Sequence, residues 1–163
     1  MTRRHLTNIY LTFFTIFLSS NLDADNNHSM VGYWLTSQSI VLVSKCEEEL
    51  CATIEHIFVD EGIDQKSILD NNNKEKSLRE RTLVGINLID GFKYIDDAKK
   101  LSGGRIYDPG RGRTFKSNIY LLQNGNLKIE GCLMRMCGHE EWKPITVKFN
   151  DDGTKKVELK ENL

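Results

Sequence analysis

The sequence has no excess of charge of either sign. It contains 22 Lys and Arg residues against 23 Asp and Glu residues, a formal net charge of −1, and the two signs are interspersed along the chain. A protein that binds a nucleic-acid backbone, or an anionic membrane through a polybasic segment, needs a stripe or cluster of cations. The sequence therefore argues against nucleic acid as a partner and against a polybasic membrane patch.

Long hydrophobic runs are also missing. A helix that crosses a membrane needs about 20 consecutive apolar residues, whereas the most apolar stretch, Ile9–Leu18, is shorter and contains two threonines. A polar segment follows it, without a stop-transfer pattern, and no cysteine lies near the N-terminus to carry a lipid. We therefore expect no stable membrane anchor.

The N-terminus instead has the order of a secretory signal peptide. Two arginines precede the apolar stretch, and a polar run follows it, which is the arrangement that export signals share. We expect residues 1–24 to be removed by cleavage after Ala24, with cleavage after Ser20 as the alternative. Residues 25–30 would then form a loose mature N-terminus, and residues 31–163 a single domain.

Motifs for catalysis are absent as well. The sequence has no nucleophile elbow, no phosphate-binding loop and no dinucleotide-binding glycine fingerprint. His139-Glu140-Glu141 lacks the spacing of a metal site, because neighbouring residues of a strand face opposite ways, so we expect a solvated loop there. Asp70–Glu75 lacks the glycine and distal glutamate of a calcium-binding loop. Nothing indicates an enzyme, and we expect no catalytic residue, cofactor or metal.

The cysteines form two pairs with the same spacing. Cys46 and Cys51 make one C-x4-C pair, and Cys132 and Cys137 make the other. An even number of cysteines in an exported chain indicates disulfides. Three connectivities are possible, and we expect the local one, in which each pair brackets a turn or strand end. A four-cysteine zinc site is the alternative, but such sites usually contain tighter C-x2-C spacings.

Alternation of apolar and polar residues is the dominant pattern of the remaining chain, and it predicts half-buried β-strands. It is clear in 50–55, 115–121, 127–133 and 145–149. The more continuously apolar runs Val31–Thr36, Ile40–Val43 and Leu83–Ile89 are expected to form strands buried on both faces, and Lys156–Leu159 a last short strand. About eight antiparallel strands in succession must close to protect their edges. The sequence predicts an all-β protein, a small antiparallel β-barrel.

One connection departs from this pattern. Asp60–Arg81 is polar and charged, and within it Lys74–Arg81 is expected to form a short helix after an asparagine cap. We interpret the segment as the one long connection of the barrel.

A proline-glycine turn near the middle of the chain carries a candidate polar site. Tyr107 and Asp108, together with Arg111 and Arg113, surround it and would form a small binding site at a barrel mouth. The alternative is structural, because an aspartate before Pro-Gly commonly bonds the backbone of its own turn.

Several short motifs resemble, in order, those of the bacterial exported family known as domain of unknown function 2147. They run from a Gly-x-Trp element at Trp34 to a second tryptophan at Trp142, and the most specific of them is Gly-Gly-x-Ile-Tyr-Asp-Pro. The motifs are Gly32–Thr36, Leu50-Cys51, Leu78–Gly85, Gly91-Phe92, Gly103–Pro109, Gly112–Phe115, Gly131-Cys132, Cys137-Gly138 and Trp142.

The resemblance implies a bacterial periplasmic protein with a barrel similar to those of the lipocalins, and no established activity. Trp34 would be first a core aromatic near one end of the barrel and second a ring on which a ligand stacks. The tentative ligand-binding residues are therefore Trp34, Tyr107, Asp108 and Arg113.

Two functions of different kinds follow from such a barrel. A hollow barrel lined by Ala52, Ile54, Ile119 and Ile129 would carry a small apolar ligand. A packed barrel would leave its outer surface and loops to bind an envelope protein or a glycan. The sequence does not indicate an oligomeric state.

Overall fold

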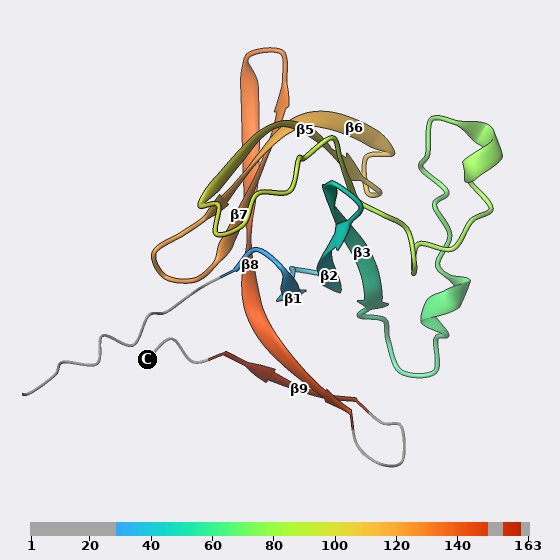
Figure 1. Cartoon of the computed structure of the whole chain (residues 1–163). Coiled ribbons are helices and arrows are strands. Elements are labelled where there is room, and N and C mark those ends of the chain that lie inside the picture. Colours follow the sequence, from blue (N-terminus) through green and yellow to red (C-terminus); the bar gives the residue numbers. More distant parts are fainter. Residues whose placement is uncertain (1–28, 150–154, 161–163) are drawn as a thin grey trace, which may run out of the picture.

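Antiparallel strands make up most of the protein. The computed structural model describes residues 29–149 and 155–160, so the expected signal peptide lies outside the described residues. The sheet has the strand order β3-β2-β1-β8-β7-β6-β5-β4, with β9 paired to β8 (Figure 1). The strands are β1 (Gly32–Leu35), β2 (Ser39–Cys46), β3 (Glu49–Ile57), β4 (Ile89–Asp90), β5 (Lys100–Asp108), β6 (Arg113–Leu121), β7 (Leu127–Leu133), β8 (Met136–Phe149) and β9 (Lys155–Leu159). The predicted all-β, lipocalin-like barrel is confirmed.

The long strand β8 connects the two halves of the sheet. Its first part pairs with β7, the stretch around Pro144 pairs with β1, and its last part pairs with β9, so β8 runs the full height of the molecule in Figure 1. The prediction of a solvated loop at His139-Glu140-Glu141 is therefore wrong. These residues form a strand because their backbone pairs with β7, even though their side chains are exposed.

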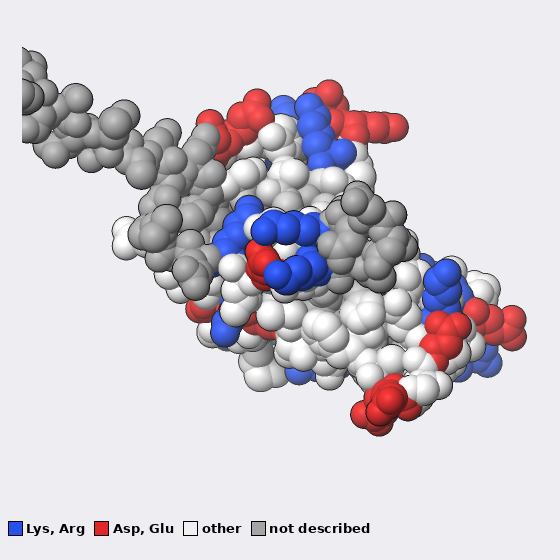
Figure 2. Space-filling view, turned by 90° about the horizontal axis from the view of Figure 1, so that it is seen from below, with Lys and Arg blue, Asp and Glu red and all other residues white. Residues whose placement is uncertain are grey.

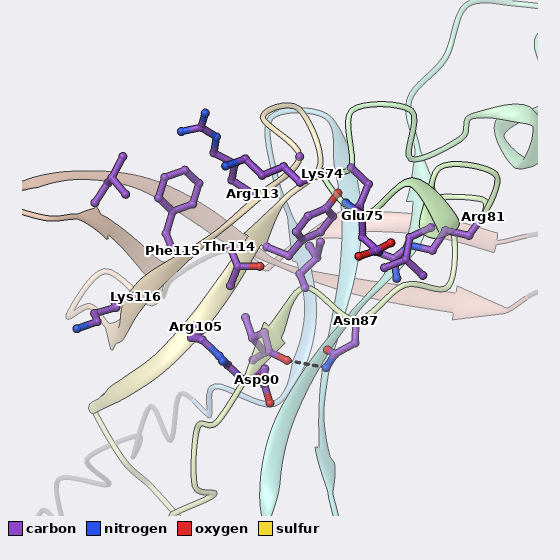
Figure 3. A pocket seen from close by; sticks show the side chains of 17 residues that line it. Lys74, Glu75, Arg81, Asn87, Asp90, Arg105, Arg113, Thr114, Phe115 and Lys116 are labelled. Carbon is purple, nitrogen blue, oxygen red and sulfur yellow. Dashed lines mark hydrogen bonds and ion pairs between the residues drawn. The ribbon is translucent and has the colours of Figure 1, made fainter.

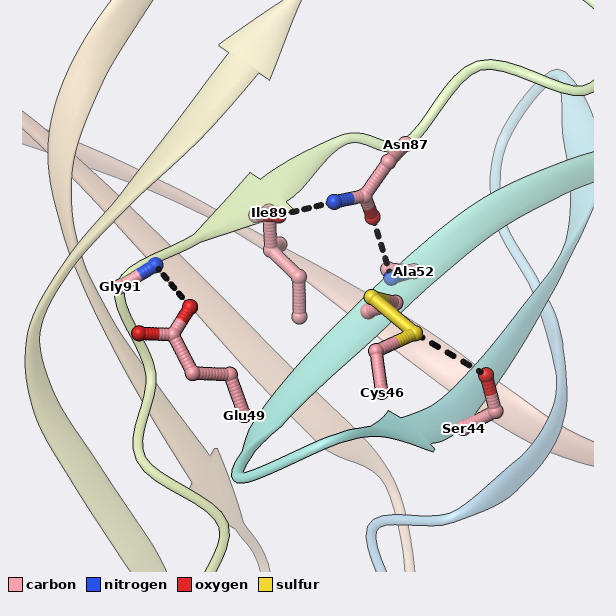
Figure 4. The surroundings of a disulfide bond; sticks show 8 residues. Ser44, Cys46, Glu49, Ala52, Asn87, Ile89 and Gly91 are labelled. Carbon is pink, nitrogen blue, oxygen red and sulfur yellow. Dashed lines mark hydrogen bonds between the residues drawn. A yellow bond between two sulfur atoms is a disulfide. The ribbon is translucent and has the colours of Figure 1, made fainter.

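The barrel is closed by an irregular segment between β3 and β5. The backbone N–H of Leu50 donates to the carbonyl of Phe92 at 2.9 Å, and that of Ile54 to the carbonyl of Ile86 at 3.1 Å. Between them, the N–H of Ala52 donates to Oδ1 of Asn87 at 2.7 Å, and Nδ2 of Asn87 donates to the carbonyl of Ile89 at 2.6 Å (Figure 4). A side-chain amide thus satisfies a strand-edge donor that would otherwise need a backbone partner.

This closure corrects the predicted strand Leu83–Ile89. Only Ile89–Asp90 is a regular strand, β4, and Gly85, with a φ of 92°, lies outside the strand conformation. Ile86, Leu88 and Ile89 are buried, whereas Leu83 and Val84 are half-buried, and the hydrogen bonds of the segment to β3 are discontinuous.

β5 is the strand that the alternation pattern did not reveal. Gly103 has a φ of 87°, and the register with β6 shifts between Ser102 and Gly104, as in a β-bulge. A Cβ atom at Gly104 would lie 2.5 Å from the ring of Phe92. The glycine therefore lets the almost fully buried Phe92 pack against the strand.

The connection from β3 to β4 contains two 3-10 turns, η1 (Gln65–Ser67) and η2 (Lys76–Leu78). The predicted helix at Lys74–Arg81 is thus reduced to a single turn, and its N-cap, Glu75, makes no side-chain capping bond. The chain doubles back instead, because the N–H of Asp70 donates to the carbonyl of Arg81 at 3.0 Å. Within the described residues, no helix has the length and apolar character that a membrane crossing requires.

The barrel has a packed end and an open end. At the packed end, inward side chains fill the interior, and the most completely buried of them leave at most 2 % of their surface exposed. They include Trp34, Val43, Leu50, Ala52, Phe92, Ile119 and Leu127. The open end lies toward the turn that joins β7 to β8, where the interior is hollow.

Candidate functional site

A cavity of about 1370 Å³ occupies the open end of the barrel. Its walls are inward side chains of β3, β5, β6 and β7, and Trp142 of β8 also lines it. Apolar residues of these strands in the lining are Ile54, Ile57, Ile106, Phe115, Ile129 and Leu133, and the lining also includes polar and charged residues such as Asn72, Arg111, His139 and Glu140. We call this space the barrel cavity, and it has room for a small organic molecule.

Gly131 removes side-chain volume from the cavity wall. It lies between Ile129 and Leu133 on the inward phase of β7, and a Cβ atom there would make ordinary 3.5 Å contacts with Ile106 and Phe115. Of the four residues expected to line a hollow barrel, Ile54 and Ile129 do so. Ala52 and Ile119 are instead buried in the packed end.

The rim of the cavity includes a carboxylate, that of Glu140, whose two oxygens both accept hydrogen bonds. Oε1 of Glu140 accepts hydrogen bonds from the backbone N–H and the hydroxyl of Ser37, at 3.0 and 2.7 Å. Oε2 accepts one from Nε1 of Trp142 at 3.1 Å. Both oxygens therefore have donors from the protein, and the bonds join the β1–β2 turn to β8.

A buried carboxylate holds the β3–β4 connection against the barrel. The side chain of Asp70 is fully buried and its Oδ2 accepts hydrogen bonds from Arg81 at 2.8 and 3.0 Å and from Asn73 at 2.7 Å. Oδ1 accepts one from the hydroxyl of Tyr107. Burial, then the hydrogen bond to Asp70, raise the pKa of Tyr107 to about 12. Paired in this way, a buried charge is tolerated, whereas an unpaired one is costly.

The same connection touches the β5–β6 turn at Gly112. This glycine has a φ of 60°, and a Cβ atom on it would lie only 1.7 Å from the carbonyl oxygen of Asn72. Nδ2 of Asn72 donates to the carbonyl of Gly110 at 3.1 Å. The close approach explains why a glycine occupies the position. It also fixes the turn that carries the predicted polar site.

Three of the four tentative ligand-binding residues line the barrel cavity, namely Tyr107, Asp108 and Arg113. Asp108 also serves its own turn, because Oδ1 accepts from the N–H of Arg111 at 3.1 Å and Oδ2 from its guanidinium at 3.2 Å. Trp34 lies elsewhere. It is buried in the packed end, and its Nε1 donates to the carbonyl of Met30 at 3.0 Å.

A second hollow, of about 840 Å³, adjoins the barrel cavity. We call it the polar groove. Figure 3 shows the charged side chains that surround it, contributed by the β3–β4 connection and by β4, β5 and β6. The two spaces share the residues Leu88, Tyr107, Arg113, Phe115 and Leu133.

The two disulfides lie at hairpin tips. One joins Cys46 to Cys51 across the β2–β3 turn, with a Cα–Cα distance of 5.8 Å, and the other joins Cys132 to Cys137 across the β7–β8 turn, at 4.1 Å. The structure therefore has the local pairing. Glu130 lies near the second pair, but sulfur atoms in a disulfide are not available as thiolate ligands for zinc.

Sequence reasoning missed Asp70 as an anchor. The sequence raised this segment only as a possible calcium-binding loop. In the structure, the Asp70 carboxylate instead accepts hydrogen bonds from Arg81, Asn73 and Tyr107. These residues meet only in the folded protein, so no local spacing could reveal them. The one available signal was Arg81, which falls within a motif of the family resemblance.

Comparisons with known proteins agree with this architecture. A family model described as "Uncharacterized protein conserved in bacteria (DUF2147)" matches residues 32–144. Among solved structures, a Helicobacter pylori protein described as belonging to the lipocalin family is similar, with a TM-score of 0.61, 19% identity, and coverage of 72% of this chain and 84% of that chain. At that identity the likeness shows a shared fold. The comparison with curated proteins finds no match. The chain belongs to the DUF2147 family of bacterial proteins.

Proposed function

We propose that the protein is an exported periplasmic binding protein that holds one small apolar molecule in its barrel cavity. The observation that carries the proposal is the cavity itself, whose wall includes apolar side chains from four strands, with Gly131 leaving part of the wall without a side chain. Burial of apolar ligand surface there supplies the driving force for binding.

Export is supported by the order of the N-terminal residues and by the cysteine pairs. Disulfides persist in oxidising compartments such as the bacterial periplasm, and both cysteine pairs lie at bonding distance. The lipocalin-like fold is consistent with a small hydrophobic ligand.

The alternative is an envelope module that binds a protein or a glycan through its surface. One observation favours it: the tip of the β7–β8 hairpin exposes 97% of Met134 and 76% of Met136. Exposed apolar side chains clustered on one projection often mark an interaction site.

A neutral, apolar fluorescent probe tests the cavity. The wild-type protein should bind it, and Gly131→Leu, which adds a side chain to the cavity wall, should weaken binding about tenfold or more. Lys143→Leu places the same side chain on an exposed position of β8 outside the cavity lining and should bind normally. If the folded wild-type protein binds no probe below its aggregation concentration, the surface-module alternative replaces the carrier.

Export has its own test. Mass analysis of the protein recovered from a bacterial periplasm should give a chain that begins after Ala24 or after Ser20. A recovered chain that retains Met1 would contradict the signal peptide.

A further inference from the structure

We propose that the ligand is an amphipathic anion, with its apolar part in the barrel cavity and its charged head in the polar groove beside Arg113. This inference rests on the proposed function and specifies the chemical class of the ligand. The shared head chemistry is a carboxylate or a phosphate.

The two spaces are arranged for one molecule to occupy both. Leu88, Tyr107, Arg113, Phe115 and Leu133 line the barrel cavity and the polar groove alike. Phe115 and Leu133 offer apolar surface, whereas the guanidinium of Arg113 offers charge. A chain leaving the barrel along Phe115 therefore meets a cation where the lining changes from apolar to polar.

The polar groove contains more positive charge than the protein itself neutralises. Two of its five cations are paired, Arg81 with Asp70 and Arg105 with Asp90. Lys74, Arg113 and Lys116 make no ion pair with any described residue, and the lining of the groove includes one further carboxylate, that of Glu75, which accepts a hydrogen bond from Ser77 at 3.1 Å. Three free cations against one free carboxylate leave a local surplus of positive charge.

On the β8–β9 hairpin, by contrast, neighbouring cations are paired with a carboxylate. Glu158 lies 2.9 Å from Lys156 and 3.0 Å from Lys148, and their hydrogen bonds lower the pKa of Glu158 to about 2. The face seen from below in Figure 2 likewise has acidic and basic side chains next to one another. The net charge of the chain, −1, hides the local excess in the groove.

The two carboxylates at the rim of the barrel cavity differ. Asp108 is paired with the cation Arg111, whereas Glu140 accepts hydrogen bonds only from the neutral groups of Ser37 and Trp142 and keeps its charge. The anionic head is therefore favoured on the side of the polar groove and not beside Glu140. An anionic head could not enter the apolar interior without a large desolvation cost. Placed beside the fork of Arg113, with Lys74 next to the same turn through its backbone bond to Gly112, it would form charge-assisted hydrogen bonds while its tail stays buried.

Amphiphiles of equal chain length but different heads test the inference. We would measure displacement of the neutral probe by dodecanoate, dodecyl phosphate and dodecanol. Both anions should bind about tenfold more tightly than dodecanol at low salt, and added salt should reduce this preference. The order of the two anions then distinguishes a carboxylate from a phosphate ligand.

Substitutions of the groove cations test where the charged head group of the ligand binds. Arg113→Gln and Lys74→Gln should each weaken binding of the preferred anion about fivefold or more and leave dodecanol unchanged. Both side chains are exposed, so the variants should fold. Lys143→Gln removes an exposed lysine outside both spaces and should change neither affinity.

The outcomes separate this inference from the function on which it rests. If dodecanol binds as tightly as the anions, or if Arg113→Gln and Lys74→Gln leave the anion preference intact, the amphipathic-anion inference is wrong and the apolar carrier stands. If neither the probe nor any amphiphile binds the wild-type protein, the carrier itself is wrong.

Discussion

The packed and open ends of the barrel are built from the same strands, yet only one of them is hollow. On β7, Leu127 fills the packed end, whereas Gly131, four residues along, lies at the cavity wall. On β6, Ile119 is buried in the core, whereas Phe115 lines the cavity. The alternation of a strand decides which side chains point inward. The size of the inward side chains, and the segments that cover the barrel, decide whether the interior is filled.

The hydroxyl of Ser117 lies between these two ends. It is buried on the inward phase of β6 and finds no hydrogen-bond partner among the described residues. Its register partners are Gly131 on β7 and Gly104 on β5. Small side chains thus begin where the packed core stops.

The largest effect should come from truncating the packed end. Ile119 is 1% exposed, so Ile119→Ala should lower the free energy of unfolding by about 2–5 kcal/mol through lost burial and a new cavity. Ile57→Ala, the same change at a half-buried residue of the open end, should cost about 1 kcal/mol. Urea denaturation measures both. Equal losses would show that the two ends are equally well packed.

The second-largest loss of stability is expected at Gly112, where the β3–β4 connection contacts the β5–β6 turn. Gly112→Ala should cost about 2 kcal/mol or more, because the new Cβ atom meets the Asn72 carbonyl and the residue must keep a positive φ. Gly110→Ala, in the same turn, meets only the side chain of Asp108 at 3.2 Å and should be mild. Denaturant unfolding of the two variants is the measurement. A mild Gly112→Ala would mean that the connection is not held against this turn.

The disulfides should contribute equally at the two ends. Each closes a loop of about six residues, for which the chain-entropy model gives about 2 kcal/mol. The variants with serine at Cys46 and Cys51, or at Cys132 and Cys137, should therefore lose similar amounts of stability in thermal or denaturant unfolding. A difference larger than about 1 kcal/mol would show that one tip depends on its bond for more than loop closure. Peptide mapping that links the two pairs to each other would contradict the local pairing.

The smallest effect is the pH dependence of the Tyr107 contact. The phenol has a pKa of about 12 in the folded protein against 10.0 in a model compound, so folding favours its protonated form. The resulting stability is fully present below about pH 10 and is lost as the pH rises through about 12. Tyr107→Phe should remove this part of the slope. The check is to compare unfolding midpoints of the two proteins across this range, and parallel curves would contradict the shift.

The sequence alone predicted the strands in which apolar and polar side chains alternate without interruption. The range 127–133 was predicted and matches β7, because Leu127 and Ile129 pack inward while Lys128 and Glu130 point outward. β5 was missed because a bulge at Gly103 shifts its phase. The first part of β8 was missed because its side chains at the rim are polar and exposed on both faces. Backbone pairing, and not a hydrophobic pattern, defines that part.

The candidate site was predictable only where turn chemistry marked it. Asp108 and Arg113 flank a proline-glycine turn, and that turn lies at the cavity rim. The polar groove and the Asp70 anchor depend on residues that are far apart in the sequence, so their spacing carries no signal before the chain folds. The surplus charge of Lys74 and Lys116 was likewise invisible in a sequence whose charges balance overall.

The pairing of β1 with β8 also constrains how the chain can fold. Tyr33 lies opposite Ile145, and Leu35 opposite Lys143, so one seam of the barrel joins residues from near the two ends of the described chain. Such non-local pairing has a high contact order, and all-β proteins of this kind fold on a scale of milliseconds to seconds. The barrel cannot be completed until the segment around Pro144 is available to pair with β1, so a chain that emerges from its N-terminal side stays incompletely folded until that segment follows.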